Sequence, residues 1–138
     1  MKGMAIEDDV LFALRQTRTW AVVGCSPDPS RDSHRIAALL QERGYRVIPA
    51  NPAADEILGE RCFASVRDIG EPVDVVDVFR RSSEAGAHVD EAIEIGAAVV
   101  WMQLGVIDEN AAARGRDAGL RVVMDRCPAI ELARLSRA

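Results

Sequence analysis

Aromatic residues are scarce in this chain of 138 residues, where they make up 4% of the sequence. An excess of cationic residues is also missing, because 17 Lys and Arg stand against 22 Asp and Glu and leave a net charge of -5. Proteins that bind nucleic acids over a surface use basic patches with aromatic side chains among them. We therefore expect no nucleic-acid partner, whereas a small anionic ligand needs only a few local arginines.

Cysteines are few as well, since only Cys25, Cys62 and Cys127 are present, widely spaced and without a Cys-x-x-Cys pair. This pattern argues against a disulfide scaffold and a zinc knuckle, and it is typical of reduced thiols in a cytoplasmic protein. No apolar run reaches the length of a membrane span, and three acids occupy residues 7–9. We expect neither a membrane span nor a secretion signal.

Glycines are missing where a dinucleotide-binding protein needs them. Residues 19–40 read as an apolar run, a turn and an amphipathic helix, with Gly24 at the junction. The dinucleotide fingerprint requires two more glycines and an acidic residue at the end of the second strand. Ser26 and Pro29 stand in place of those glycines, and Asn51 stands in place of the acid. The sequence therefore disfavours a nicotinamide dinucleotide oxidoreductase, but not a protein that binds another adenine nucleotide.

What the sequence does contain is a regular alternation of apolar and amphipathic stretches. Five short runs of the kind that a parallel sheet buries on both faces occupy residues 20–24, 46–50, 73–79, 97–103 and 120–125. Helical periodicity marks residues 33–43, 83–95, 108–118 and 128–135, and an amphipathic leader helix is predicted at residues 6–17. Residues 52–69 are too irregular to predict a helix.

These elements predict an α/β fold in one domain spanning residues 1–138, with residues 1–18 as its leader. Strands joined by right-handed crossovers give a doubly wound, Rossmann-like domain with helices on both faces of a five-stranded parallel sheet. The expected strand order is 3-2-1-4-5. Gly44, Gly96 and Gly119 each follow a helix, where a left-handed cap favours glycine.

The carboxyl ends of the predicted strands carry mostly polar or basic residues. In an open parallel sheet a ligand binds beyond these ends, near the point where the strand order reverses. Gly24 lets the backbone approach a ligand there, and free N–H groups at the start of the next helix point at a phosphate. The other candidate contacts are Cys25, Ser26, Asn51, Pro52, Phe79, Arg80, Met102, Gln103 and Leu104, with Ser33 and His34 on the following helix.

Some of these residues also have a purely structural explanation. In this explanation Gly24 serves only to permit a tight turn, and Ser30 or Ser33 serves only to cap the helix. If Gly24 instead makes room for a ligand, a valine there abolishes binding and leaves the fold intact. We expect Arg80 to contact the ligand and Arg81 to face solvent, because neighbouring residues on a strand point to opposite sides.

No catalytic residue is predicted. Cys25 lacks a histidine or an acid spaced to act with it. Asp77 lies inside a strand that should be buried, where a helix N–H or an arginine is the expected partner. Trp20 and Trp101 are expected in the core, and His88 is expected at the surface.

Five motifs in a fixed order resemble those of a known family. They are VVGCSPDPSR, GYRVIPANP, VDVVDVFR, VWMQLGV and VVMDRC, and the resemblance extends over residues 20–135. The chain resembles the small CoA-binding proteins, whose Rossmann-like domain is similar to the CoA-binding domain at the start of the succinyl-CoA ligase alpha subunit.

This resemblance implies a ligand and a set of contacts. The turn from Gly24 through Cys25 and Ser26 to Pro27 is expected to cradle the CoA diphosphate. Asn51-Pro52, Phe79-Arg80 and Met102-Gln103-Leu104 are expected to line the groove for the adenosine and the start of the pantetheine arm. The chain departs from many relatives in carrying Ala53-Ala54 where a basic residue often follows the Asn-Pro pair. The phosphohistidine of the ligase belongs to a second domain, so ligase activity is not implied.

The sequence thus predicts a small cytoplasmic protein that binds CoA or an acyl-CoA non-covalently and has no catalytic centre of its own. Two alternatives stay open. In the first, the chain is the CoA-binding subunit of a multi-chain acyl-CoA ligase. In the second, it is a regulatory module whose affinity for a protein partner changes when CoA binds. A homo-oligomer or an unidentified protein partner is compatible with either.

Overall fold

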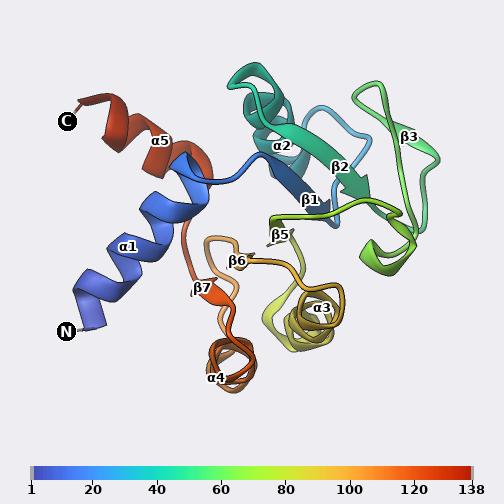
Figure 1. Ribbon diagram of the computed structural model, residues 1–138. Helices are drawn as coiled ribbons and strands as arrows, with labels where there is room; N and C mark the ends of the chain where they lie inside the picture. The colour runs from blue at the N-terminus through green and yellow to red at the C-terminus, as the bar shows by residue number, and fades with distance from the viewer. Residues whose placement is uncertain (1, 138) are drawn as a thin grey trace.

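The computed structural model describes residues 2–137, with side chains from Ile6 onward. Five parallel strands form the central sheet in the order β2-β1-β5-β6-β7 (Figure 1). Their bounds are β1 Thr19–Val23, β2 Arg46–Ala50, β5 Val75–Val78, β6 Val99–Met102 and β7 Arg121–Val123. The helices are α1 Lys2–Arg15, α2 Asp32–Glu42, α3 Ser82–Glu94, α4 Glu109–Asp117 and α5 Pro128–Arg137. A hairpin of β3 (Glu56–Ile57) and β4 (Glu60–Arg61) and the short 3-10 helix η1 (Val66–Asp68) connect β2 to β5.

Helices cover both faces of the sheet, as predicted. On one face α3 and α4 pack through Ala85, Val89 and Ala111 against side chains from the central strands. On the other face α1, α2 and α5 bury Leu14, Leu40 and other apolar residues against Trp20 and Trp101. Both tryptophans are fully buried, which confirms their predicted place in the core. Figure 1 shows α1 and α5 together on one side of the molecule, where the chain begins and ends.

The predicted strand order 3-2-1-4-5 is wrong in one respect. The third strand of the core, β5, pairs with β1 and not with β2, so the order in core numbering is 2-1-3-4-5. The free edge of β2 is taken by Phe63, which exchanges backbone hydrogen bonds with Pro49 and Asn51. Pro49 also has no N–H to offer a further strand on that edge, and proline in a sheet is typical of an edge strand.

A carboxylate at the start of β5 accounts for its position beside β1. Asp74 Oδ2 accepts hydrogen bonds from the backbone N–H groups of Arg18 and Thr19, both at 2.9 Å.

The predicted helix-ending glycines adopt the left-handed conformation, with φ of +94° at Gly44, +73° at Gly96 and +92° at Gly119. These caps turn the chain directly into the next strand.

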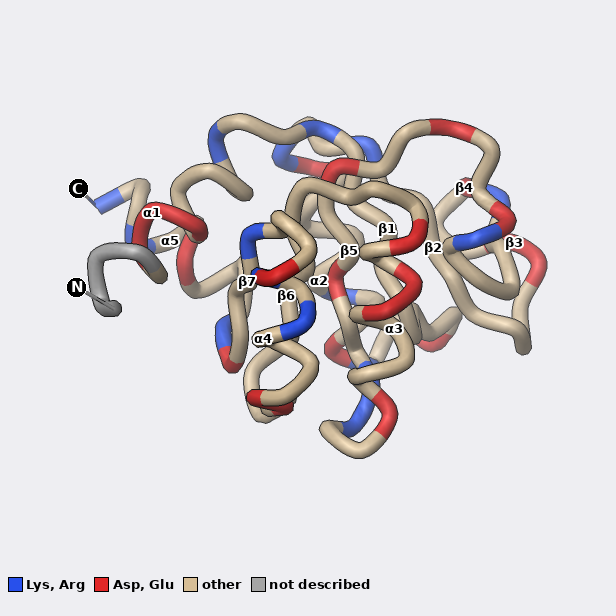
Figure 2. Tube along the Cα trace, turned by 60° about the horizontal axis from the view of Figure 1, so that its bottom comes forward, with Lys and Arg blue, Asp and Glu red and all other residues tan. Residues whose placement is uncertain are grey.

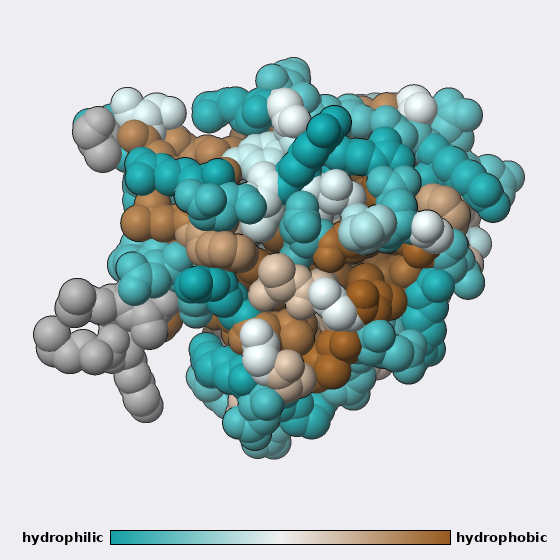
Figure 3. Space-filling model, in the orientation of Figure 1, coloured by the Kyte–Doolittle hydropathy of each residue, from teal (hydrophilic) through white to brown (hydrophobic). Residues whose placement is uncertain are grey.

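Charges of both signs are interspersed along the chain (Figure 2). Apolar side chains gather over α3 and beside it, as the brown atoms of Figure 3 show. Within the part of the chain that the structure describes, no helix combines the length and the apolarity needed to cross a membrane.

Candidate functional site

Two hollows lie at the carboxyl ends of the strands, where a ligand is expected. The larger, of about 1020 Å³, lies beside the turn that follows β1 and also borders Phe79, Gln103 and Leu104. We call it the turn compartment. The smaller, of about 450 Å³, lies between α3, the ends of β1 and β2, and residues 64–66. We call it the α3 compartment. Arg80 and Glu84 border both, so the two compartments adjoin, and we refer to them together as the groove.

The predicted site residues divide into three groups. Those that line the turn compartment are Gly24, Ser26, Ser33, Phe79, Arg80, Gln103 and Leu104. Pro52 lines the α3 compartment together with Arg80. Those that line neither hollow are Cys25, Pro27, His34, Asn51 and Met102. Of these five, Cys25 and Met102 are fully buried in the core.

The turn after β1 is held by side chains that the sequence pattern marked as ligand contacts. Asn51 Nδ2 donates to the backbone oxygen of Cys25 at 2.9 Å, and Asn51 Oδ1 accepts from Ala53 N at 2.9 Å. The first of these bonds needs a donor, which an acidic residue lacks once it is ionised. Ser33 Oγ accepts from Ser26 N at 2.9 Å, and His34 Nδ1 lies 2.9 Å from the oxygen of Ser26.

The helices that begin at this groove have open N-termini. The residue before α2 is Arg31 and the residue before α3 is Arg81, and neither side chain caps its helix. The alternative that Ser30 or Ser33 caps α2 is therefore wrong, because Ser30 Oγ bonds to Asp28 and Ser33 to Ser26. First-turn N–H groups without a side-chain acceptor favour an anion.

Gly24 is required by the chain itself. Its φ is +80°, and a Cβ built on it would lie 2.4 Å from the backbone oxygen of Phe79 and 3.3 Å from Arg80 Nε. The expectation that a valine there would leave the fold intact is therefore wrong. The missing side chain lets the turn after β1 pass close to the end of β5, and this places Arg80 beside the turn.

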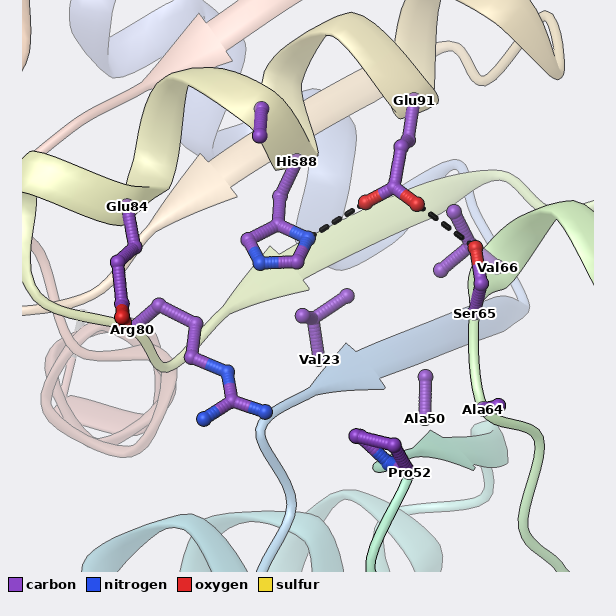
Figure 4. A pocket seen from close by; sticks show the side chains of 11 residues that line it. Val23, Ala50, Pro52, Ala64, Ser65, Val66, Arg80, Glu84, His88 and Glu91 are labelled. Atoms are coloured by element: carbon purple, nitrogen blue, oxygen red, sulfur yellow. Dashed lines mark hydrogen bonds and ion pairs between the residues drawn. The ribbon is translucent and has the colours of Figure 1, made fainter.

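Arg80 and Arg81 differ in their surroundings, as expected. The Arg81 side chain is 78% exposed, lies 3.9 Å from Glu84 and borders only the turn compartment, at its open side. Arg80 is half-buried and extends into the α3 compartment, and Figure 4 draws no partner for its guanidinium among the residues around it. An unpaired guanidinium at the junction of two hollows is suited to an anionic ligand.

Asp77 lies behind the groove and is fully buried. The expected partner, a helix N–H or an arginine, is wrong. The partner is Gln103, whose Nε2 donates to Asp77 Oδ1 at 2.7 Å. The other oxygen, Oδ2, has no hydrogen-bond partner among the described residues. Burial raises the pKa of Asp77 to about 8, although the bond from Gln103 acts in the opposite direction. A protonated Asp77 and a fixed Gln103 amide therefore lie under the groove at neutral pH.

Cys25 does not have the surroundings of a nucleophile. Burial, with Cys62 and Asp77 nearby, raises the pKa of its thiol to about 12. A thiol of this kind carries almost no thiolate at neutral pH and does not reach the groove. All three cysteines are free thiols. Among the residues with described side chains, no three acids, histidines or cysteines gather to hold a metal ion.

The α3 compartment contains functional groups that the sequence pattern missed. Glu91 is 8% exposed, accepts from Ser65 Oγ at 2.7 Å through Oε2, and lies 2.5 Å from His88 Nδ1 through Oε1. The expectation of a surface position for His88 is wrong, because the imidazole is half-buried and borders the hollow. Glu84, His88 and Glu91 stand at positions i, i+4 and i+7 of one helix face, and this spacing is the signal that would have grouped them.

Comparison with known proteins identifies the family of this chain. The model of the CoA binding domain family matches residues 18–133. The chain belongs to this CoA-binding domain family. The finding confirms the resemblance that the five sequence motifs carry.

Relatives of this CoA-binding domain are similar over most of their length. The uncharacterized protein YneT of Bacillus subtilis (strain 168) is 40% identical over 114 residues, which are 83% of this chain and 84% of YneT. The solved structure of a hypothetical protein from Pyrococcus horikoshii OT3 is 38% identical, with a TM-score of 0.88 over 94% of this chain and 91% of that one.

The same CoA-binding domain is also similar to part of a larger enzyme. It aligns with a dinucleotide-forming acetyl-coenzyme A synthetase 1 of Ca. Korarchaeum cryptofilum at 27% identity and a TM-score of 0.72. The match covers 83% of this chain and 28% of the synthetase. The remaining length of the synthetase has no counterpart in the match.

Proposed function

We propose that the chain binds CoA or an acyl-CoA non-covalently in the groove formed by the two compartments. The observation that carries this proposal is Arg80, a half-buried guanidinium at the junction of the two hollows that has no partner among the described residues. Membership of the CoA-binding domain family supports CoA as this anion.

The arrangement of the groove suits a ligand with a diphosphate between two unlike ends. The open N-termini of α2 and α3 supply backbone N–H groups for the diphosphate, and the turn at residues 24–27 lies beside them. Gln103 and Leu104 line one end of the groove, and Pro52 lines the other. Asn51 and His34 act on the ligand through the turn that they hold in place.

In the proposed function the protein binds CoA without catalysing a reaction. Cys25, the candidate nucleophile that the sequence offers, is buried, and burial raises the pKa of its thiol. The three free thiols support a reducing compartment such as the cytoplasm. A second function, as the CoA-binding subunit of a multi-chain acyl-CoA ligase, is supported by the match to 28% of an acetyl-coenzyme A synthetase.

Native mass spectrometry of the protein purified from its own cells tests both functions. A mass increment equal to CoA or to an acyl-CoA on a free chain or a homo-oligomer supports the first function. A stable complex with a different chain supports the second. Recovery with a bound nicotinamide dinucleotide would overturn both.

A further inference from the structure

An imidazole and a carboxylate form one wall of the α3 compartment. His88 and Glu91 are three residues apart on α3, with His88 Nδ1 2.5 Å from Glu91 Oε1. The carboxylate is nearly buried and its other oxygen is occupied by Ser65 Oγ. A carboxylate in this position holds the ring hydrogen on Nδ1, which leaves Nε2 for another partner.

The free edge of this imidazole is directed toward a cation. Figure 4 shows Nε2 on the side of the ring away from Glu91 and toward Arg80, whose guanidinium extends into the same hollow. The remaining walls are mostly apolar, from Val23, Ala50, Pro52 and Val66. The guanidinium and the Nε2 edge of the imidazole thus share one compartment, and Nε2 becomes a second donor when the ring is protonated.

The charges around the hollow make it sensitive to one proton. The charged groups that border it are Arg80, Glu84 and Glu91, and outside this lining Arg81 lies 3.9 Å from Glu84 and is counted with them. The ends of β1 and β2 and residues 64–66 contribute no titratable side chain to the lining. Behind Glu91, Arg67 pairs with Glu94. With a neutral imidazole these charges balance, and with a protonated imidazole the compartment gains a net positive charge.

We propose that His88 and Arg80 form a binding site for a phosphomonoester dianion, and that the imidazole takes up a proton when this group binds. CoA carries such a group at its ribose 3′ position, so the inference rests on the proposed function and extends it. A phosphate oxygen accepts from the guanidinium and from Nε2–H. The Glu91 carboxylate behind the ring and the phosphate in front of it both have the sign of charge that holds a proton on an imidazole.

The variant His88→Asn separates this role from a structural one. An asparagine amide nitrogen takes the place of Nδ1 and keeps the bond to Glu91, whereas nothing replaces Nε2. Calorimetric titration of CoA into wild type and variant, in PIPES and in Tris at about pH 7, measures the protons taken up per CoA, because these buffers differ in ionisation enthalpy. Wild type is expected to take up more protons than the variant. The ionisation of the CoA phosphate itself is the same in both titrations and drops out of the difference.

The affinities give a second readout. At about pH 6 the variant is expected to bind CoA roughly tenfold more weakly than wild type, and the gap narrows at about pH 8.5 as the imidazole loses its proton. With 3′-dephospho-CoA the two proteins are expected to bind equally at both pH values. Melting temperatures control for the fold. If His88→Asn does not fold, Glu91→Gln, which keeps hydrogen-bonding atoms but not the charge, is expected to reduce the proton uptake.

Other outcomes overturn the inference. Equal proton uptake and equal CoA affinity in wild type and variant would show that His88 does not meet the phosphate. An affinity loss of the same size with 3′-dephospho-CoA would assign the effect to another part of the ligand. Both results leave CoA binding by wild type in place, whereas wild type that binds no CoA at all would remove the proposed function as well.

Discussion

The two compartments of the groove are built in different ways. The turn compartment consists largely of residues that directly follow β1, β5 and β6, and most of its lining is polar. The α3 compartment combines strand ends, one face of α3 and residues 64–66 from an irregular connection, around the buried Glu91. The first is a product of sheet topology, since all parallel strands end at one edge. The second depends on how a connection folds back against a helix.

The largest effect is expected at Gly24, where the turn compartment meets the end of β5. Replacing Gly24 with alanine is expected to lower the free energy of unfolding by about 3 kcal/mol or more, because the added carbon meets the Phe79 oxygen in a left-handed backbone. Gly44→Ala is the matched control, since Gly44 has φ of +94° and no atom within 4 Å of the added carbon. Its expected cost is about 1–2 kcal/mol.

Denaturant unfolding measures both variants. Equal costs at the two glycines would show that the close approach of the turn to Phe79 does not constrain the protein. A Gly24→Ala variant of full stability that no longer binds CoA would restore the view that the glycine only makes room for a ligand.

The next effect concerns the junction of the compartments. Arg80→Ala is expected to weaken CoA binding by about 1.5–3 kcal/mol and to reduce its dependence on salt, because a hydrogen bond to a charged group is lost. Arg81→Ala is the control and is expected to change little, since its side chain is 78% exposed. Titration calorimetry at two salt concentrations measures both. A damaging Arg81→Ala with a silent Arg80→Ala would place the anion outside the junction.

An effect of similar size is expected from the titration of Asp77, but on the free energy of unfolding and not on CoA binding. Burial raises its pKa from 3.8 to about 8, so between these values the folded protein holds a proton that the unfolded chain releases. The contribution of this group to stability is present at low pH and is lost as the pH rises toward about 8. Asp77→Asn has no such titration, and its stability relative to wild type is expected to rise by about 1–3 kcal/mol from about pH 5 to about pH 8.

Urea unfolding of wild type and Asp77→Asn across this pH range checks the sign. A constant difference between the two proteins would mean that Asp77 does not change protonation on folding. The asparagine oxygen still accepts from Gln103, so the variant keeps the bond that fixes the Gln103 amide.

The smallest effect is expected within the turn itself. Ser33→Ala removes the acceptor of the Ser26 N–H and is expected to cost about 1 kcal/mol of unfolding free energy. Ser30→Ala is the comparison, because Ser30 is exposed and its hydroxyl donates to Asp28, two residues earlier in the same turn. Thermal unfolding of both variants measures the difference. Equal stabilities would show that water replaces Ser33 as the partner of Ser26.

The regular part of the molecule could be predicted from the sequence. The five strands of the central sheet and the five α-helices lie within a few residues of where the apolar periodicity placed them, whereas the β3–β4 hairpin and η1 were not predicted. The strand order could not be predicted from periodicity, although Pro49 is a local sign that β2 lies at an edge. The pairing of β5 with β1 depends on Asp74 and on the path of residues 52–74, which no repeat describes.

The site divides in the same way. Strand-end residues such as Ser26 and Gln103 were predicted to line the groove because topology alone brings them together. Asn51, by contrast, has the position of a ligand contact but holds the turn through the Cys25 oxygen. Glu91 was missed because its partner Ser65 lies 26 residues earlier in the sequence and reaches it only through tertiary packing, and His88 was missed with it because its partner is Glu91.

The central claim is that the groove is specific for CoA and not for a nicotinamide dinucleotide. Titration calorimetry of the purified chain with CoA and with NAD tests it most directly. The account predicts CoA binding in the micromolar range, about -8 kcal/mol, and NAD binding at least about tenfold weaker. The reason is the single-glycine turn with Asn51, whose amide is committed to Cys25 and offers no carboxylate to a ribose diol. Equal affinities for the two ligands, or no binding of CoA, would contradict it.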